Sequence, residues 1–412
     1  MKEKIVFILV ILYLIQNPLG QVINAVNYLD EGFTLLGLYI LLIKVIKCFH
    51  QRIYCEKWLF RILLCLVFMI VIGICGNIAW GYQKMIFVLL DMVSFMKFFV
   101  GLLVGYLFSV DQYSNEFKKK LLWLCKIIVV LQFILSIHEQ LFTPWFEYLY
   151  GWKYIKAIKL YYTTQTYLVA YSVFCLAIFF LLCKNNREKI GYGILTIIPI
   201  ILTMRSKAWG FLVLFFIIVL ITRQLCLRTP FGLGIFSLPM IIIVAWDKIK
   251  LYFLDSTHYS PRLIILQDGW ALAQEHFPLG TGFGTFCSVG AAVGGSPIYD
   301  LLGLDYTSEY IGKSINDMYW GYLLGQFGFM GTIVMLAIIV ELIMAVWKLQ
   351  SGQRDRFMSG ICLIIYIIIA SIGESPFFAS YIMGFAFLIG SILGDITRRR
   401  HNEVGKKRTV SK

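Results

Sequence analysis

Long apolar runs recur along the whole chain and are separated by short polar turns. A run of roughly 20 apolar residues is long enough to cross a hydrocarbon core about 30 Å thick. Because lipid offers no hydrogen-bond partners, the backbone of such a run must satisfy itself within a helix. The alternation of apolar and polar residues that is typical of an outer-membrane barrel is absent. The pattern therefore predicts an all-α, polytopic protein of the lipid bilayer.

The spacing of the runs predicts about twelve transmembrane helices in a single polytopic domain over residues 1–412. The predicted spans are 5–25, 33–48, 58–76, 86–109, 119–138, 164–184, 189–204, 207–223, 230–247, 328–347, 357–372 and 377–395. The first resembles a signal peptide in its position, but no small-residue cleavage site follows it. We interpret it as a retained span with a break at Pro18.

Composition and charge agree with this class. The chain is 59% hydrophobic and 15% charged, whereas soluble domains have about 25% charged residues. The net charge of +14 does not indicate a nucleic-acid partner, because basic residues in membrane proteins mostly fix orientation. Basic clusters such as Lys118–Lys120 and Arg398–Arg400 fall on the same side as the N-terminus. We expect a multi-pass protein of a bacterial plasma membrane with both termini in the cytoplasm and a basic cytoplasmic tail over 396–412.

The cysteines and histidines indicate neither a disulfide framework nor a metal site. Of the ten cysteines, only Cys287 falls in a predicted outer segment, where it has no partner of its kind. No CxxC pair or zinc-type His spacing occurs. We expect no metal, no cofactor and no structural disulfide.

Two longer segments lie on the face opposite the predicted cytoplasmic side. The first, about 139–163, is rich in aromatic residues and lysines. The second, 248–317, is the longest polar stretch and predicts a large extracytoplasmic loop between spans nine and ten. Long loops are usually functional or disordered, and the aromatic and aliphatic content of this one argues against disorder. Apolar residues at helical spacing over 262–276 predict an amphipathic helix on the membrane surface.

Charged residues at the outer rim of the spans are the strongest functional candidates, because charge near a membrane core is costly. Arg205 falls in a short outer turn, and Arg262 begins the predicted surface helix. Each could simply snorkel to headgroups, but a guanidinium also forms bidentate contacts with phosphate. Asp317 precedes span ten. It could be a helix N-cap or a general base toward a hydroxyl.

Further charges lie within the spans. Asp91 and Lys97, both in span four, do not share a helical face, so each is expected to meet other partners in the bundle. Lys126 and Glu341 lie nearer the cytoplasmic ends, where snorkelling or pairing explains them. Glu374, in the last outer turn, is a weaker functional candidate.

Three glycines, Gly280, Gly282 and Gly284, stand at alternate positions of the segment PLGTGFGTF. A tight turn requires glycine for conformational reasons alone. The pattern is not a dinucleotide fingerprint, which follows a strand in a soluble unit. Its meaning depends on the motifs that flank it.

Four segments resemble, in order, the motifs of the O-antigen ligase and Wzy polysaccharide polymerase superfamily. TMRSKAWG resembles its outer turn with Ser and Arg, and SPRLIILQDGWALAQEH resembles its Arg before an amphipathic stretch. FPLGTGFGTF resembles its hPl-GxGxGxF signature. In NDMYWGYLLGQFGFMG, Asp317 stands eleven residues before Gly328, where the superfamily has His or Asp. The resemblance covers about 200–331.

The chain departs from the ligases at one important position. Ligases typically have His where this chain has Asp317, whereas Asp is common in polymerases, so the resemblance favours a polymerase. Gln326 stands where the superfamily often has Glu, which suggests that the acid is not essential there.

The resemblance implies a membrane glycosyltransferase. It would polymerise undecaprenyl-diphosphate-linked oligosaccharide repeat units into surface polysaccharide (capsule, exopolysaccharide or O-antigen) at the outer leaflet. Arg205 and Arg262 would hold the diphosphate, and Asp317 would accept the proton of the attacking hydroxyl. A chain-length regulator and a flippase of the same pathway are candidate partners. A divalent ion at Asp91 or Asp317 is the less favoured alternative to charge stabilisation by arginine.

The lysines of the outer segments are candidates for steering the anionic donor, and the aromatic residues for stacking on sugars, although interfacial aromatics also anchor membrane proteins. The candidate substrate-binding residues are Lys207, Lys153, Lys156, Lys159, Trp145, Trp152, Tyr161, Asp91, Lys97, Gly280, Gly282 and Gly284.

Two alternatives remain open. A ligase-type transferase shares the fold and the arginines. A lipid-linked oligosaccharide flippase or transporter predicts key charges near the membrane midplane, whereas the candidates here gather at the outer rim. No internal repeat or pair of broken helices, the usual sign of a transporter, is visible.

Overall fold

The computed structural model describes residues 2–48, 56–150, 155–224, 261–304 and 317–395. The helices are α1 (Lys2–Gly20), η1 (Asn24–Tyr28), α2 (Leu29–Cys48), α3 (Lys57–Trp80), α4 (Met85–Leu107), η2 (Val110–Gln112), α5 (Asn115–Leu141), α6 (Gln165–Leu182), α7 (Asn186–Leu202), α8 (Ser206–Gln224), α10 (Pro261–Glu275), α11 (Val289–Gly294), α12 (Pro297–Leu301), α14 (Tyr319–Trp347) and α15 (Arg354–Ala370), followed by a helix at Ile382–Asp395. Within these ranges the only strands, β1 (Tyr148–Tyr150) and β2 (Lys156–Ile158), form a short antiparallel hairpin. The described chain is therefore all-α apart from this hairpin, as the sequence predicts.

Seven helices of the described ranges are long and apolar enough to cross a membrane. They are Glu3–Gly20, Asn24–Lys44, Lys57–Trp80, Met85–Leu107, Asn115–Leu141, Gln165–Leu182 and Tyr319–Trp347. Two further apolar helices, Ser206–Leu220 and Ile382–Asp395, are shorter. The membrane class is thus supported, and the expected count of about twelve spans stays a prediction. The predicted span 230–247 and the tail 396–412 lie outside the described residues.

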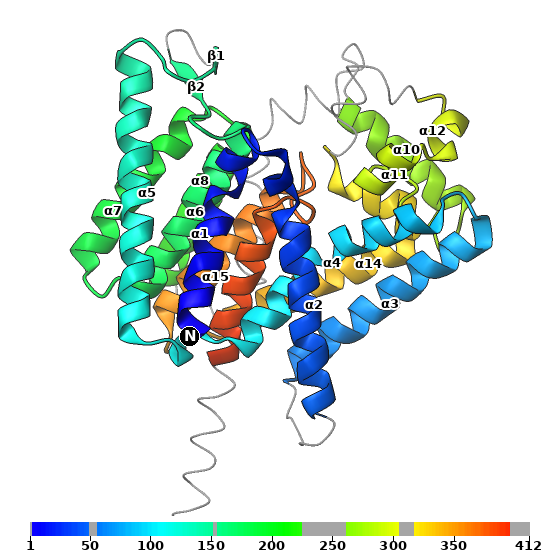
Figure 1. The fold of residues 1–412 in the computed structure, drawn as a ribbon, viewed down its shortest axis with the longest axis horizontal. Coiled ribbons are helices and arrows are strands. Elements are labelled where there is room, and N and C mark those ends of the chain that lie inside the picture. Colours follow the sequence, from blue (N-terminus) through cyan, green and yellow to red (C-terminus); the bar gives the residue numbers. More distant parts are fainter. Residues whose placement is uncertain (1, 49–55, 151–154, 225–260, 305–316, 396–412) are drawn as a thin grey trace, which may run out of the picture.

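The helices form two groups with a shared centre (Figure 1). On one side, α6 packs against α5, α7 and α15, and α15 also contacts α8. On the other side, α14 packs against α3 and α10, and α4 contacts α11. The predicted surface helix over 262–276 is confirmed as a helix, α10, and the loop that contains it also holds α11 and α12.

The two ends of the bundle are defined by polar contacts between distant segments. Near the start of α1, the Glu3 carboxylate accepts from the Ser114 backbone N–H at 2.6 Å. Arg356 contacts Asp111 at 2.7 Å and Asp395 at 3.0 Å, so the last described helix ends there too. Figure 1 shows the start of α1 and the end of this helix at the end of the bundle opposite the hairpin and α10.

The largest difference from the predicted spans is at α14. Its N-terminal end is Tyr319, whereas the sequence pattern places the span at 328–347. The helix passes through Gly328, where φ is 62° and ψ is −165°, so the backbone leaves helical geometry there. A break of this kind exposes carbonyl groups that need partners from elsewhere.

The glycine-rich loop supplies those partners. The Thr281 N–H donates to the Gly325 carbonyl, and the Gly282 N–H donates to the Gln326 carbonyl, each at 2.9 Å. A Cβ on Gly280 would lie 2.5 Å from the Gly328 nitrogen, so only glycine allows this approach. The loop is therefore a buried plug in the kink of α14.

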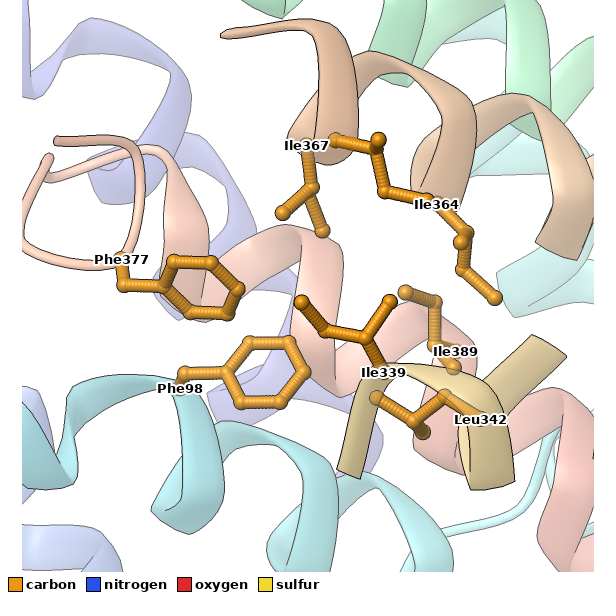
Figure 2. Close-up of a pocket in the computed structure, with 8 residues that line it drawn as sticks. Phe98, Ile339, Leu342, Ile364, Ile367, Phe377 and Ile389 are labelled. Atoms are coloured by element: carbon orange, nitrogen blue, oxygen red, sulfur yellow. The ribbon is translucent and has the colours of Figure 1, made fainter. Parts of the chain in front are cut away.

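The core where the two groups meet is tightly packed. Phe98 of α4 and Phe377 contact edge to face, with ring centroids 5.1 Å apart. They line a small apolar cavity (Figure 2) of about 10 Å³ together with Ile339, Leu342, Ile364, Ile367, Ile368 and Ile389. A cavity of this size has room for at most one water molecule, and its apolar walls offer that water no hydrogen bonds.

Candidate functional site

Charged side chains from four separate segments gather at the end of the bundle opposite the start of α1 and the end of the helix Ile382–Asp395. We call them the polar cluster: Arg205, Lys207, Arg262, Asp317 and Glu374, with the neutral Gln165 and Thr166. Asp317 lies within electrostatic range of all three cations. Because Arg262 and Asp317 belong to the α10–α14 group and the others to the α6–α8–α15 group, the cluster stands at the junction of the two groups.

Arg205 is aimed by the tight turn between α7 and α8. The preceding residue, Met204, has a φ of 53°, a left-handed conformation that non-glycine residues rarely adopt. The Arg205 guanidinium donates to the Gln165 side-chain oxygen at 2.8 Å. The side chain therefore crosses to the start of α6. A snorkelling arginine would instead extend its guanidinium away from the protein toward water.

Lys207 meets two partners from other helices. Its ammonium donates to the Thr166 hydroxyl at 2.5 Å. It also forms an ion pair with the carboxylate of Glu374, and the Thr166 hydroxyl donates to the same carboxylate oxygen. The first turns of α6 and α8 and the turn after α15 are thereby joined by one polar network.

Arg262 and Asp317 form the second ion pair of the cluster. Arg262, in the first turn of α10, places a guanidinium nitrogen 3.5 Å from an oxygen of Asp317. The N-cap of α14 is Met318, so helix capping does not account for Asp317. Burial raises the pKa of the Asp317 carboxyl above its ordinary value, although the positive charges of Arg262 and Lys207 lower it. A carboxylate with a raised pKa is a stronger base.

The cluster has an excess of positive charge and is partly exposed. Three cations face two carboxylates in this set of residues. The side chains of Lys207 and Glu374 are 15% and 23% exposed, and those of Arg262 and Asp317 are 27% and 38% exposed. Two guanidiniums and an ammonium at one accessible place are suited to an anion, above all a phosphate.

The glycine-rich loop and Asp91 are buried among the helices α3, α4 and α14. The loop is buried, with Gly280, Gly282 and Gly284 at φ values of 73°, 92° and 72°. Asp91 is also buried and accepts from the Gly284 N–H at 2.8 Å. The closest atoms to these glycines belong to α3, α4 and α14, so the predicted substrate-binding glycines serve here to close the fold.

Lys97 lies in a separate buried ion cluster. Its ammonium contacts Asp30 at 2.5 Å and Glu31 at 2.6 Å, both at the start of α2. Gln16 of α1 donates to Asp30 at 2.8 Å. Lys97 and Asp91 therefore meet different partners, as their spacing predicts.

The described lysines of the hairpin segment, Lys156 and Lys159, form contacts within that segment. The Lys156 ammonium donates to the carbonyls of Glu139 and Phe142 at 2.9 and 3.1 Å, at the C-terminal end of α5. Lys159 pairs with Glu147 at 2.6 Å. These contacts place neither lysine in the polar cluster.

The aromatic candidates of this region are only partly described. Trp145 is 69% exposed, with its ring 4.0 Å from that of His138. Tyr161 packs on Tyr162, with ring centroids 4.6 Å apart. Both are placed at the hairpin and not in the polar cluster. Trp152 and Lys153 lie outside the described residues.

Sequence reasoning missed Gln165 and Thr166 and ranked Glu374 low. The two neutral residues gave no signal, because polar residues are common at a helix start. Glu374 was visible as an acid in an outer turn, but only the fold shows that it faces Lys207. Among the described residues, no group of three or more His, Cys, Asp or Glu side chains could hold a metal ion.

Comparison with known proteins adds no assignment. No family model matches the chain, and no curated protein matches it in sequence. The functional argument therefore rests on the chemistry and geometry of the polar cluster.

Proposed function

We propose that the protein is a polysaccharide polymerase of the membrane. It would transfer a growing glycan from undecaprenyl diphosphate to a lipid-linked repeat unit at the outer leaflet of a bacterial plasma membrane. The observation that carries the proposal is that Asp317 contacts Arg262 and lies within electrostatic range of Arg205 and Lys207. These residues come from the segments whose motifs resemble the O-antigen ligase and polymerase superfamily.

The proposed reaction is a displacement at the donor sugar. The acceptor hydroxyl oxygen bonds to the anomeric carbon, and the bond from that carbon to the diphosphate oxygen breaks with its electron pair on the diphosphate. Arg205 and Arg262 stabilise the negative charge that grows on the leaving group. The Asp317 carboxylate accepts the hydroxyl proton, a role that its raised pKa supports. The donor and the acceptor together balance the step, and Asp317 then releases the proton to water before the next transfer.

An apolar groove supports a lipid-linked donor. It has a volume of about 340 Å³ and lies between α1 and α2, with α6 and the helix Ile382–Asp395 behind it. Its lining includes Val10, Leu36, Phe174, Met383 and Phe387. Phe174 of this lining lies on α6, the helix that carries Gln165 and Thr166 of the polar cluster in its first turn. A polyprenyl chain in the groove would leave its diphosphate at the cluster end.

The proposed orientation places the polar cluster outside and both termini inside. In this arrangement the chain crosses the membrane about twelve times, and 248–317 forms the outer loop. The support is the concentration of basic residues at the end of the bundle where α1 begins and the helix Ile382–Asp395 ends: Lys118–Lys120 lie in the first turns of α5, and α15 begins at Arg354. Cytoplasmic segments are generally enriched in Lys and Arg.

The test is polymerisation of a lipid-linked repeat unit in membranes that contain the full-length protein. Wild type is compared with Arg205→Ala and with a matched control, Arg187→Ala, an exposed arginine in the first turn of α7. We expect glycan ladders from wild type and the control and a loss of about 10²–10³ in rate from Arg205→Ala.

Each alternative has its own outcome in this assay. Equal ladders from both variants would show that the anion site is assigned wrongly. Transfer of a single finished glycan to a different acceptor would indicate a ligase-type transferase. Movement of the lipid across the bilayer without any transfer would indicate a flippase.

A further inference from the structure

The anion site of the polar cluster already contains an anion of its own. The Lys207 ammonium, which contacts Thr166 in the first turn of α6, is paired with the Glu374 carboxylate. Thr166 binds both groups through its hydroxyl, so the carboxylate has one cationic and one hydroxyl partner. A phosphate oxygen takes the same two kinds of donor.

The turn that carries Glu374 also reaches the second ion pair. A Cβ on the adjacent Gly373 would lie 3.8 Å from the central carbon of the Arg262 guanidinium. Arg262 in turn contacts Asp317. The Glu374 carboxylate is therefore held at the place where the charges of both helix groups converge.

The charges of the polar cluster determine how strongly a bound diphosphate is attracted or repelled. With both carboxylates ionised, the three cations and two acids leave a net charge of +1. A diphosphate diester carries about two negative charges, so it would bind beside two fixed carboxylates. Like charges within about 4–6 Å repel strongly at the partly buried sites of a protein.

We propose that Glu374 is an internal counter-ion that occupies the anion position beside Lys207 and is displaced from it when a diphosphate binds. The inference rests on the proposed function, because it takes a diphosphate as the ligand. The device keeps Lys207 neutralised in the empty site and limits the affinity of the site for the anion. Weaker binding favours release of the polyprenyl diphosphate product after each transfer.

The test measures binding of inorganic pyrophosphate to the detergent-purified full-length protein by titration calorimetry at fixed low salt. Glu374→Gln keeps the size and hydrogen-bonding capacity of the side chain and removes its charge. We expect this variant to bind pyrophosphate about tenfold more tightly than wild type. The matched control is Glu147→Gln, which removes a carboxylate from an exposed ion pair of the outer hairpin and should leave the affinity unchanged.

A double-mutant cycle separates displacement from general repulsion. Lys207→Met removes the cation for which the carboxylate and the phosphate compete. In this background, the gain from Glu374→Gln should fall to less than half of its value in the wild-type background. Melting temperatures of the four proteins verify that each variant is folded.

The outcomes are distinct. A Glu374→Gln affinity equal to or weaker than wild type overturns the counter-ion role while leaving the anion site intact. A gain that is undiminished in the Lys207→Met background also overturns it, because the carboxylate then acts through repulsion at a distance. If neither wild type nor Glu374→Gln binds pyrophosphate, the anion site itself is wrong, and the proposed function fails with the inference.

Discussion

Two clusters of charged side chains in the described part of the protein differ in the burial of their cations and in their balance of cations and carboxylates. In the first, Lys97 lies between Asp30 and Glu31; the side chains of Lys97 and Asp30 are only 4% and 5% exposed, and that of Glu31 is 27% exposed. In the second, the polar cluster, the side chains of the ion pairs are 15% to 38% exposed, and cations outnumber carboxylates. The buried cluster has more carboxylates than cations and holds α2 to α4.

This difference indicates that the first cluster stabilises the fold, whereas the second is suited to bind a ligand. A buried cation held by two carboxylates at 2.5 and 2.6 Å is already neutralised, so it attracts a further anion weakly. A partly exposed set of three cations and two carboxylates carries net positive charge, which favours an incoming anion. Membrane-embedded charge is by default a functional hypothesis, but here only the more exposed cluster has the composition of a site.

The largest effect is expected from breaking the buried cluster. Lys97→Met leaves two carboxylates without their cation, which typically costs about 3–5 kcal/mol. We expect a loss of this size in the free energy of unfolding, measured in detergent. The triple variant Lys97→Met, Asp30→Asn, Glu31→Gln should recover most of it. Unchanged stability of the single variant would contradict the structural role.

The corresponding change in the polar cluster should affect activity instead of stability. Arg262→Ala is expected to lower the polymerisation rate by about 10²–10³, with a stability change within about 1 kcal/mol, as for exposed ion pairs. Arg262→Lys should recover only part of the rate, because an ammonium lacks the bidentate geometry of a guanidinium. Rates and melting temperatures measured on the same preparations check this, and full recovery by lysine would argue against a bidentate contact.

The pH dependence should sharpen the assignment of Asp317. A general base acts only when ionised, and burial raises the pKa of this carboxyl above 3.8. Activity should therefore fall as the pH is lowered through that raised value. Asp317→Asn should show low activity at every pH, without the acid limb. An unchanged acid limb in the variant would assign the titration to another group.

The smallest effect is expected at Asp268, an acid of α10 outside both clusters. Burial raises its pKa to about 6, and one of its buried oxygens has no hydrogen-bond partner among the described residues. Because the folded state holds the proton more tightly than the unfolded state, the stabilisation is complete below pH 3.8 and is lost as the pH rises to about 6.

Asp268→Asn should therefore stabilise the protein at pH 7.5 and have little effect near pH 4. After allowance for solvent screening, the gain at pH 7.5 is about 1 kcal/mol. Melting temperatures of both proteins at the two pH values measure it. A gain of equal size at both pH values would mean that the charge of Asp268 is not its cause.

The sequence predicted the elements well where a single segment carries the signal. Apolar runs of membrane length predicted α3, α4, α5 and α6, because a helix in lipid is specified by its own composition. The start of α14 was wrong by nine residues, since Tyr319 lies in a segment that reads as polar and turn-rich. Its helix persists through the kink at Gly328 only because the glycine-rich loop supplies hydrogen-bond donors from a distant segment.

The sequence by itself determined the helical membrane class and singled out Arg205, Arg262 and Asp317, because intramembrane length and misplaced charge are local properties of a chain. Tertiary structure alone decided which charges meet. It pairs Lys97 with Asp30 and Glu31 and places Glu374 against Lys207. It also packs Gly280, Gly282 and Gly284 against α3, α4 and α14. Such pairings join residues far apart in sequence, and they follow from helix packing, which no local pattern encodes.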